Sequence, residues 1–68
     1  MATILDKIGN NVKETRKRLK LSQEQLAFKA KVDMTSVSEI ESGLRNLSVR
    51  TLAKLAKALE KEPYELLK

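Results

Sequence analysis

The side chains that could carry out chemistry here are hydroxyls, amides, carboxylates and basic groups, because the sequence contains no cysteine and no histidine. Thiolate chemistry, imidazole acid–base catalysis, disulfides and the usual zinc sites are therefore excluded. The serines have no histidine base to activate them, and two glycines are too few for a phosphate-cradling loop. Glu39 and Glu41 fall on different faces of one predicted helix. We predict no catalytic residue, no metal site and no cofactor. The polar side chains are then left to bind a partner through hydrogen bonds and charge.

Two short helices joined by a tight turn are predicted in the middle of the chain. Ser22 lies three residues before Gln25, a spacing that forms a capping box at the start of the first helix. Asp33 can cap the second helix, and Gly43 supplies the left-handed residue that commonly ends one. Because only residues 31–33 separate the two helices, they must cross steeply. This arrangement is a helix-turn-helix.

The charge of the chain favours a polyanionic partner. The 68 residues carry a formal charge of +5, and the pI is near 9.8. Basic residues gather in segments 13–20 and 44–58, whereas acids gather near the C-terminus. No apolar run is long enough to span a membrane, and the first residues do not resemble a secretory signal. We therefore expect one soluble domain over residues 1–68, located in the cytoplasm.

Further helices are predicted on both sides of this pair. Apolar residues at helical spacing, from Leu5 to Leu19, predict a first helix over about residues 3–19, which Gly9 weakens slightly. Ser48 can cap a fourth helix that runs to about Lys61. Residues 44–47 are expected to form a loop, and Pro63 is suited to the first position of a last short helix that carries Tyr64, Leu66 and Leu67. The expected fold is all-α, with five helices in one compact domain.

The chain resembles the lambda-repressor-type, or Cro/repressor-like, helix-turn-helix family of prokaryotic and phage regulators. The resemblance covers nearly the whole chain and rests on four segments, which are Leu21-Ser22-Gln23, Leu26-Ala27, Val37 to Gly43, and Leu52 with Leu55 to Leu59. The small size and the segment Gly43 to Ser48 are similar to the controller proteins that regulate restriction-modification genes. The resemblance implies sequence-specific binding to double-stranded DNA as a transcriptional regulator.

The resemblance implies that the second helix of the pair lies in the major groove, where each base pair presents a distinct pattern of donors, acceptors and methyl groups. Placing Val37 and Ile40 inward turns the opposite face of this helix toward the bases. The candidates for base contacts are Met34, Thr35, Ser36, Ser38 and Glu39. Glu39 could accept from a cytosine amino group, pair with a nearby arginine, or repel wrong sequences. Alternatively, Ser36 and Ser38 are only small surface residues.

Phosphate contacts are expected from the starts of two helices, whose free N–H groups and dipoles attract anions, and from basic or polar side chains near them. The candidates are Gln23, Arg45, Asn46, Ser48 and Arg50. The alternative for the two arginines is a solvated charged face. By the resemblance, Arg16 and Glu41 form a partly buried, structural ion pair.

The chain departs from the family pattern at Lys31, in a turn where the family often has glycine with a positive φ. Either this lysine takes that conformation under strain, or the turn follows another path. The sequence does not decide whether Phe28 is packed or exposed.

The C-terminal segment offers a candidate interface with a second copy of the chain. Its members are Tyr64, Leu66 and Leu67, which either close the monomer core or, as the resemblance implies, contribute to a homodimer on an inverted-repeat operator. RNA polymerase is a further candidate partner. The alternative to DNA binding is an antitoxin-like or adaptor module that uses the fold to hold a protein.

Overall fold

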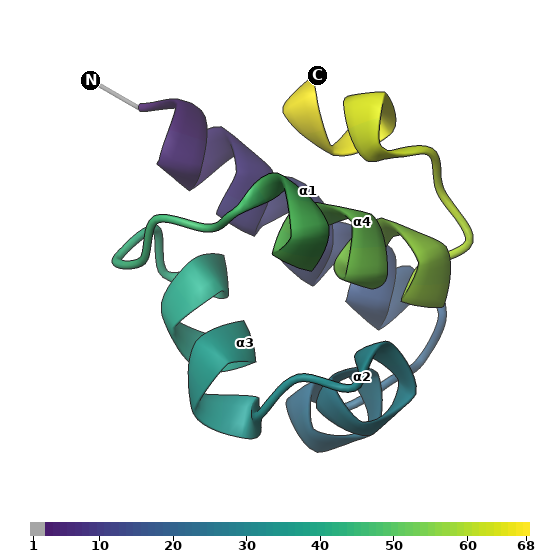
Figure 1. The fold of residues 1–68 in the computed structure, drawn as a ribbon. Helices are drawn as coiled ribbons and strands as arrows, with labels where there is room; N and C mark the ends of the chain where they lie inside the picture. The colour runs from purple at the N-terminus through teal and green to yellow at the C-terminus, as the bar shows by residue number, and fades with distance from the viewer. Residues whose placement is uncertain (1–2) are drawn as a thin grey trace.

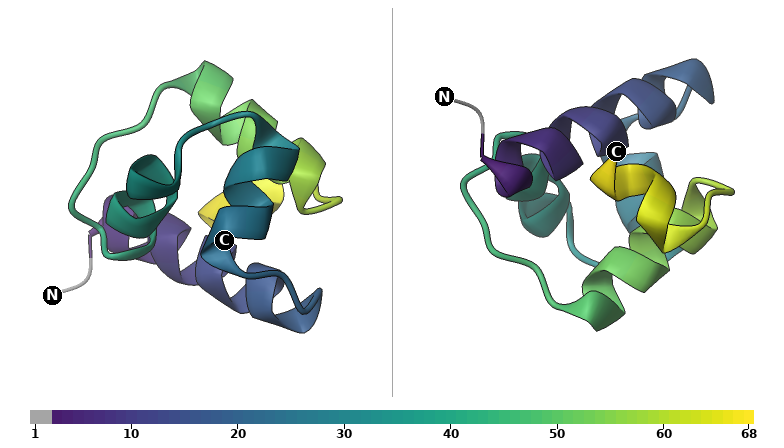
Figure 2. Two further views of the ribbon diagram at one scale, coloured as in Figure 1. Left: turned by 90° about the horizontal axis from the view of Figure 1, so that it is seen from below. Right: turned by 90° about the horizontal axis from the view of Figure 1, so that it is seen from above.

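The computed structural model describes residues 3–68, which form four α-helices and one short 3-10 helix with no strand among them (Figure 1). The elements are α1 (Ile4–Arg18), α2 (Gln23–Ala30), α3 (Met34–Glu41), α4 (Val49–Ala58) and η1 (Pro63–Leu67). The all-α class is confirmed, and α2 and α3 form the predicted pair across a short turn. Figure 2 shows the longer α3–α4 connection running along one side of the molecule.

The prediction of five helices is not confirmed, because the last short helix, residues Pro63–Leu67, is a 3-10 helix that follows four α-helices. In this segment the N–H of Glu65 donates to the carbonyl oxygen of Glu62, 2.9 Å away. Five residues that begin with proline, which has no N–H, are too few to establish the longer-range ladder of an α-helix. The fourth helix also ends earlier than predicted, at Ala58, because Glu60 adopts a φ of 61°.

Each α-helix begins at a side chain that accepts a hydrogen bond from the first turn. The N-caps are Thr3, Ser22, Asp33 and Ser48. Those at residues 22, 33 and 48 are the ones predicted from the sequence, and the first two helices have complete capping boxes. These caps satisfy backbone donors that would otherwise lack partners, so local sequence largely sets where each helix starts.

Each α-helix is followed by a residue with a positive φ angle. These residues are Lys20, Lys31, Gly43 and Glu60. At Lys31, φ is 61° and ψ is 43°, so of the two alternatives for this turn the structure shows the left-handed lysine. The N–H of Val32 then donates to the carbonyl of Ala27 at 3.0 Å, which closes the helix end and aims the chain toward α3.

Replacing Lys31 with glycine is expected to stabilise the fold by about 1 kcal/mol, because glycine has no Cβ to oppose the left-handed conformation. Urea unfolding followed by circular dichroism measures the change. Lys54→Gly is the matched control, since Lys54 lies within α4 and glycine there is expected to destabilise by a similar amount. Destabilisation by both variants would contradict the strained conformation of Lys31.

The core is built from one apolar stripe of each helix. Its largest fully buried side chains are Val12, Leu26, Val37, Ile40, Leu55, Leu59 and Leu66. Leu47 and Leu52 pack against it. Leu19, predicted on the inward stripe of the first helix, is instead 37% exposed, because it follows the last helical turn of α1. The buried stripe of α3 fixes which of its faces remains outside.

Gly9 allows α1 and α3 to cross in close contact. A Cβ on Gly9 would clash with the carbonyl oxygen of Ile40 and lie 2.9 Å from that of Glu41. The last turn of α3 therefore rests directly on the backbone of α1. This contact sets the position of α3, the helix that carries the candidate base contacts.

Candidate nucleic-acid interface

The outward face of α3 presents small polar and flexible side chains to solvent. Thr35 and Ser38 are exposed, Met34 is 51% exposed, and Glu39 is partly exposed. Val37 and Ile40 hold the opposite face in the core. Four of the five predicted base-contact residues are thus accessible on one helix of suitable size for a major groove.

The structure turns the fifth predicted residue, Ser36, inward. Its exposed fraction is 7%, and its hydroxyl donates to Asp33 Oδ1 at 2.7 Å. The hydroxyl oxygen of Ser36 also accepts from Arg45 Nη1 at 2.8 Å. The helical wheel put Ser36 at the edge of the face, but the side chain of Arg45 from the following loop covers it. Ser36 therefore lies outside the accessible face of α3 and is not among the accessible candidates for base contact.

The N-cap of α3 is held by these same contacts. Ser36 donates two hydrogen bonds to the Asp33 carboxylate, one from its hydroxyl and one from its backbone N–H. These hydrogen bonds, with a smaller contribution from the nearby charge of Arg45, hold the pKa of the Asp33 carboxyl below its usual value. Asp33 therefore caps α3 as a carboxylate throughout the neutral range.

Arg45 also pairs with Glu39. The Nη1 atom of Arg45 donates to Glu39 Oε1 at 3.0 Å, and both side chains are nearly half exposed, at 47% and 45%. Arg45 was predicted as a phosphate contact and Glu39 as a base contact. The structure brings the two together at the edge of α3, which is one of the three alternatives for Glu39.

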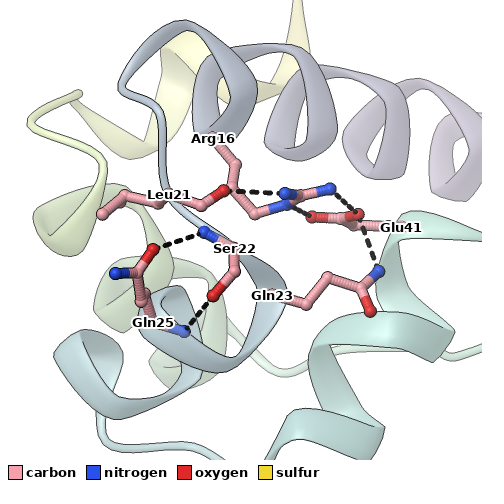
Figure 3. A network of polar contacts seen from close by, with 6 residues as sticks. All are labelled: Arg16, Leu21, Ser22, Gln23, Gln25 and Glu41. Atoms are coloured by element: carbon pink, nitrogen blue, oxygen red, sulfur yellow. Dashed lines mark hydrogen bonds and ion pairs between the residues drawn. The ribbon is translucent and has the colours of Figure 1, made fainter.

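A buried network joins α1, the start of α2 and the end of α3 (Figure 3). Arg16 Nε donates to Glu41 Oε2 at 2.6 Å, and Arg16 Nη1 donates to the carbonyl oxygen of Leu21 at 2.8 Å. The side chains of Arg16 and Glu41 are only 11% and 3% exposed. The two residues implied as a structural pair are thus in contact, and they tie three elements together.

Gln23 belongs to this network as well. Its Nε2 donates to Glu41 Oε1 at 3.0 Å (Figure 3). The side chain predicted to contact phosphate is therefore held by a carboxylate at the junction of α2 and α3. This role was not predicted, because it depends on Glu41, which is distant in the sequence.

The start of α4 carries the remaining predicted phosphate contacts. The Ser48 hydroxyl accepts from the N–H of Thr51 at 3.1 Å, so it is used as the helix cap. Asn46 and Arg50 are exposed, and Arg50 forms no ion pair with any residue in the range 3–68. Arg50 is therefore available to an external anion.

Two negative findings apply to the described part of the chain. Residues 3–68 contain no group of three or more carboxylate, imidazole or thiol side chains placed to hold a metal ion. No helix in the same range is long and apolar enough to cross a membrane.

Comparison with known proteins identifies the family. A sequence model described as helix-turn-helix matches residues 12–66. The chain is 40% identical over 60 residues to the control protein C.BamHI of Bacillus amyloliquefaciens. The aligned segment covers 87% of this chain and 74% of that protein. Control protein C.MunI of a Mycoplasma species is also 40% identical over 60 residues, covering 87% of this chain and 81% of that protein.

A solved structure agrees with the sequence comparison. The restriction-modification controller protein C.AhdI from Aeromonas hydrophila matches with a TM-score of 0.88 and 45% sequence identity, covering 91% of this chain and 94% of that one. The chain therefore belongs to the Cro/C1-type helix-turn-helix family, and it is a DNA-binding transcription regulator rather than an enzyme.

Proposed function

We propose that the protein binds a specific double-stranded DNA operator by inserting α3 into the major groove. The observation that carries the proposal is the division of α3 into two faces, one fixed in the core and the other accessible. Met34, Thr35 and Ser38 are the proposed direct contacts on this face. Met34 offers apolar contact, whereas the two hydroxyls can donate, accept or, for Thr35, touch a thymine methyl.

Phosphate contacts would come from side chains in and beside the loop that joins α3 to α4, and from the exposed N-termini of helices. Arg50, Asn46 and the first N–H groups of α4 lie beside the same loop, and the start of α2 adds further donors. Such contacts set the affinity and the register on the duplex but do not read sequence.

The variant Arg50→Ala is expected to weaken binding to all duplexes about equally. The slope of the logarithm of the binding constant against the logarithm of the salt concentration should fall in magnitude by about one, as for the loss of one phosphate contact. Fluorescence anisotropy at several salt concentrations, with a specific and a scrambled duplex, measures both quantities. Lys57→Ala, at an exposed position near the other end of α4, is the control and should change neither. A loss confined to the specific duplex would contradict the phosphate role.

We also propose that the protein acts as a homodimer that places two α3 helices about 34 Å apart on an inverted repeat. Tyr64 and Leu67 are 59% and 41% exposed and are available for such an interface. Leu66 is 1% exposed, so its side chain closes the monomer core and is not part of the proposed interface. The relatives named above suggest that the regulated genes encode a restriction-modification system. The protein would then act in the cytoplasm, with RNA polymerase as a candidate partner at the promoter.

Selection of bound duplexes from a randomised pool, near physiological salt, tests the proposal. The affinity for specific sites is expected to exceed the affinity for non-specific DNA by a factor of about a thousand or more. Recovery of an inverted repeat with half-sites one helical turn apart supports the proposal. Absence of any enriched sequence would overturn it and favour a protein-binding module of the antitoxin-like or adaptor kind.

A further inference from the structure

We infer that Arg45 is a base-reading residue that recognises a guanine, and that Glu39 is the residue that positions it. This inference rests on the proposed function, because it concerns the same α3 face. It changes the role of both residues, since Arg45 was predicted to contact phosphate and Glu39 to read a base. The pair would act as a single unit at the edge of α3.

The contacts of Arg45 within the protein use only one of its three guanidinium nitrogens. Its Nη1 atom donates to both Ser36 Oγ and Glu39 Oε1, at 2.8 and 3.0 Å, so both of its hydrogens are engaged. The Nε and Nη2 atoms have no acceptor within residues 3–68. Those two atoms form the planar fork of a guanidinium, and guanine presents O6 and N7 as a matching pair of acceptors in the major groove.

The guanidinium of Arg45 is held in a fixed orientation by α3. Ser36 is buried and is itself bonded to the cap residue Asp33, so Arg45 is anchored on the fixed frame of α3 rather than on a mobile surface group. Ordering a long side chain before binding removes part of the entropic cost of forming the contact. Phosphate contacts do not need such orientation, because they depend mainly on charge.

The carboxylate of Glu39 would be repelled by nearby phosphates if it were alone. Its Oε1 accepts from Arg45, and its side chain is 45% exposed. Pairing offsets the negative charge and orients Arg45, as a charge-assisted hydrogen bond does.

Arg50 is held differently from Arg45. It lies on α4, is exposed, and makes no side-chain hydrogen bond or ion pair within residues 3–68. The two arginines near the loop thus differ in how they are held. Only Arg45 is oriented by α3.

The experiment repeats the randomised selection with the wild type, Arg45→Lys, Glu39→Gln and Arg50→Ala, after thermal unfolding shows that each variant folds. The wild type should select a guanine at one position of each half-site. Arg45→Lys keeps the charge but lacks the fork, so it should lose about tenfold or more of that preference and keep the rest of the motif. Glu39→Gln should relax the same position, whereas Arg50→Ala should leave the motif unchanged.

Each contrary outcome has a distinct meaning. An unchanged motif for Arg45→Lys would overturn the base-reading role and return Arg45 to the phosphate contacts. Relaxation at a different position in Glu39→Gln would show that Glu39 reads a base directly, which overturns its positioning role. Failure of the wild type to select any motif would overturn the proposed function itself, and would not be confused with either result.

Discussion

Replacing Arg16 with alanine is expected to lower the free energy of unfolding by about 3 kcal/mol, because the variant leaves a buried carboxylate without its main partner. Glu41 is only 3% exposed, and it keeps just one donor from the network, the amide of Gln23. The carbonyl oxygen of Leu21 loses its bond from Arg16 as well. A loss of this size is a large part of the stability of a domain of 68 residues.

Urea unfolding of Arg16→Ala and of the matched control Arg18→Ala measures this effect. Arg18 is exposed on the same helix, so its loss removes a positive charge from the end of α1 without disturbing the network. The double variant Arg16→Ala/Glu41→Ala should recover part of the loss, since no charge is then left buried. Equal stability of the two single variants would show that Arg16 and Glu41 are independent surface charges.

Replacing Gly9 with alanine is expected to destabilise the fold by roughly 2 to 3 kcal/mol, the upper part of the range for overpacked core sites. The added Cβ would meet the carbonyl oxygens of Ile40 and Glu41, which are backbone atoms and cannot rotate away. The gain in helix propensity, about 1 kcal/mol, opposes this effect but is smaller. The α1–α3 crossing must open, which also displaces the end of α3, the helix that we propose enters the major groove.

The matched control is Asn10→Ala, at the next position of α1, where the side chain is exposed. It should leave the melting temperature unchanged or raise it slightly, because alanine favours the helix. A Gly9→Ala variant as stable as this control would contradict the close crossing of α1 and α3. Loss of DNA affinity in Gly9→Ala at temperatures where the variant is folded would link the crossing to the placement of α3.

Local interactions explain why most of the fold could be predicted. Helix starts depend on residues within one turn, as at Ser22 and Asp33, and the sequence shows these directly. The inward stripe of α3 follows from the spacing of Val37 and Ile40 alone. The sequence does not distinguish a 3-10 helix from an α-helix at residues 63–67, because the same apolar spacing suits a short helix of either kind.

Non-local contacts explain what the sequence did not predict. From the sequence alone, Gly9 was expected only to weaken a helix. The carbonyl groups that leave no room for a Cβ at this position belong to the end of α3, which is distant in the sequence. Ser36 is covered by Arg45 from a loop, and Gln23 is held by Glu41 from another helix. A glycine inside a strongly helical segment is, however, a signal of close packing that sequence reading can use.

The burial of Leu66 has the same kind of cause. The sequence left open whether this residue closes the monomer or joins a dimer. In the structure, Asn11 of α1 donates from Nδ2 to the carbonyl oxygen of Leu66 at 2.8 Å, which fixes η1 against α1. The side chain then points into the core, where it is 1% exposed.

The most direct test of the central claim, that α3 enters the major groove, uses a single introduced cysteine, because the chain has none of its own. Thr35→Cys places a unique thiol on the outward face of α3, and Glu14→Cys places one on the exposed surface of α1 as the control. Each is coupled to an iron chelate that cleaves nearby DNA, and the variant is bound to the selected operator. We predict that the Thr35→Cys conjugate cuts both half-sites at positions facing the major groove, with centres about one helical turn apart, and that the Glu14→Cys conjugate does not. Diffuse or absent cleavage from Thr35→Cys, or focused cleavage from Glu14→Cys, would contradict the claim.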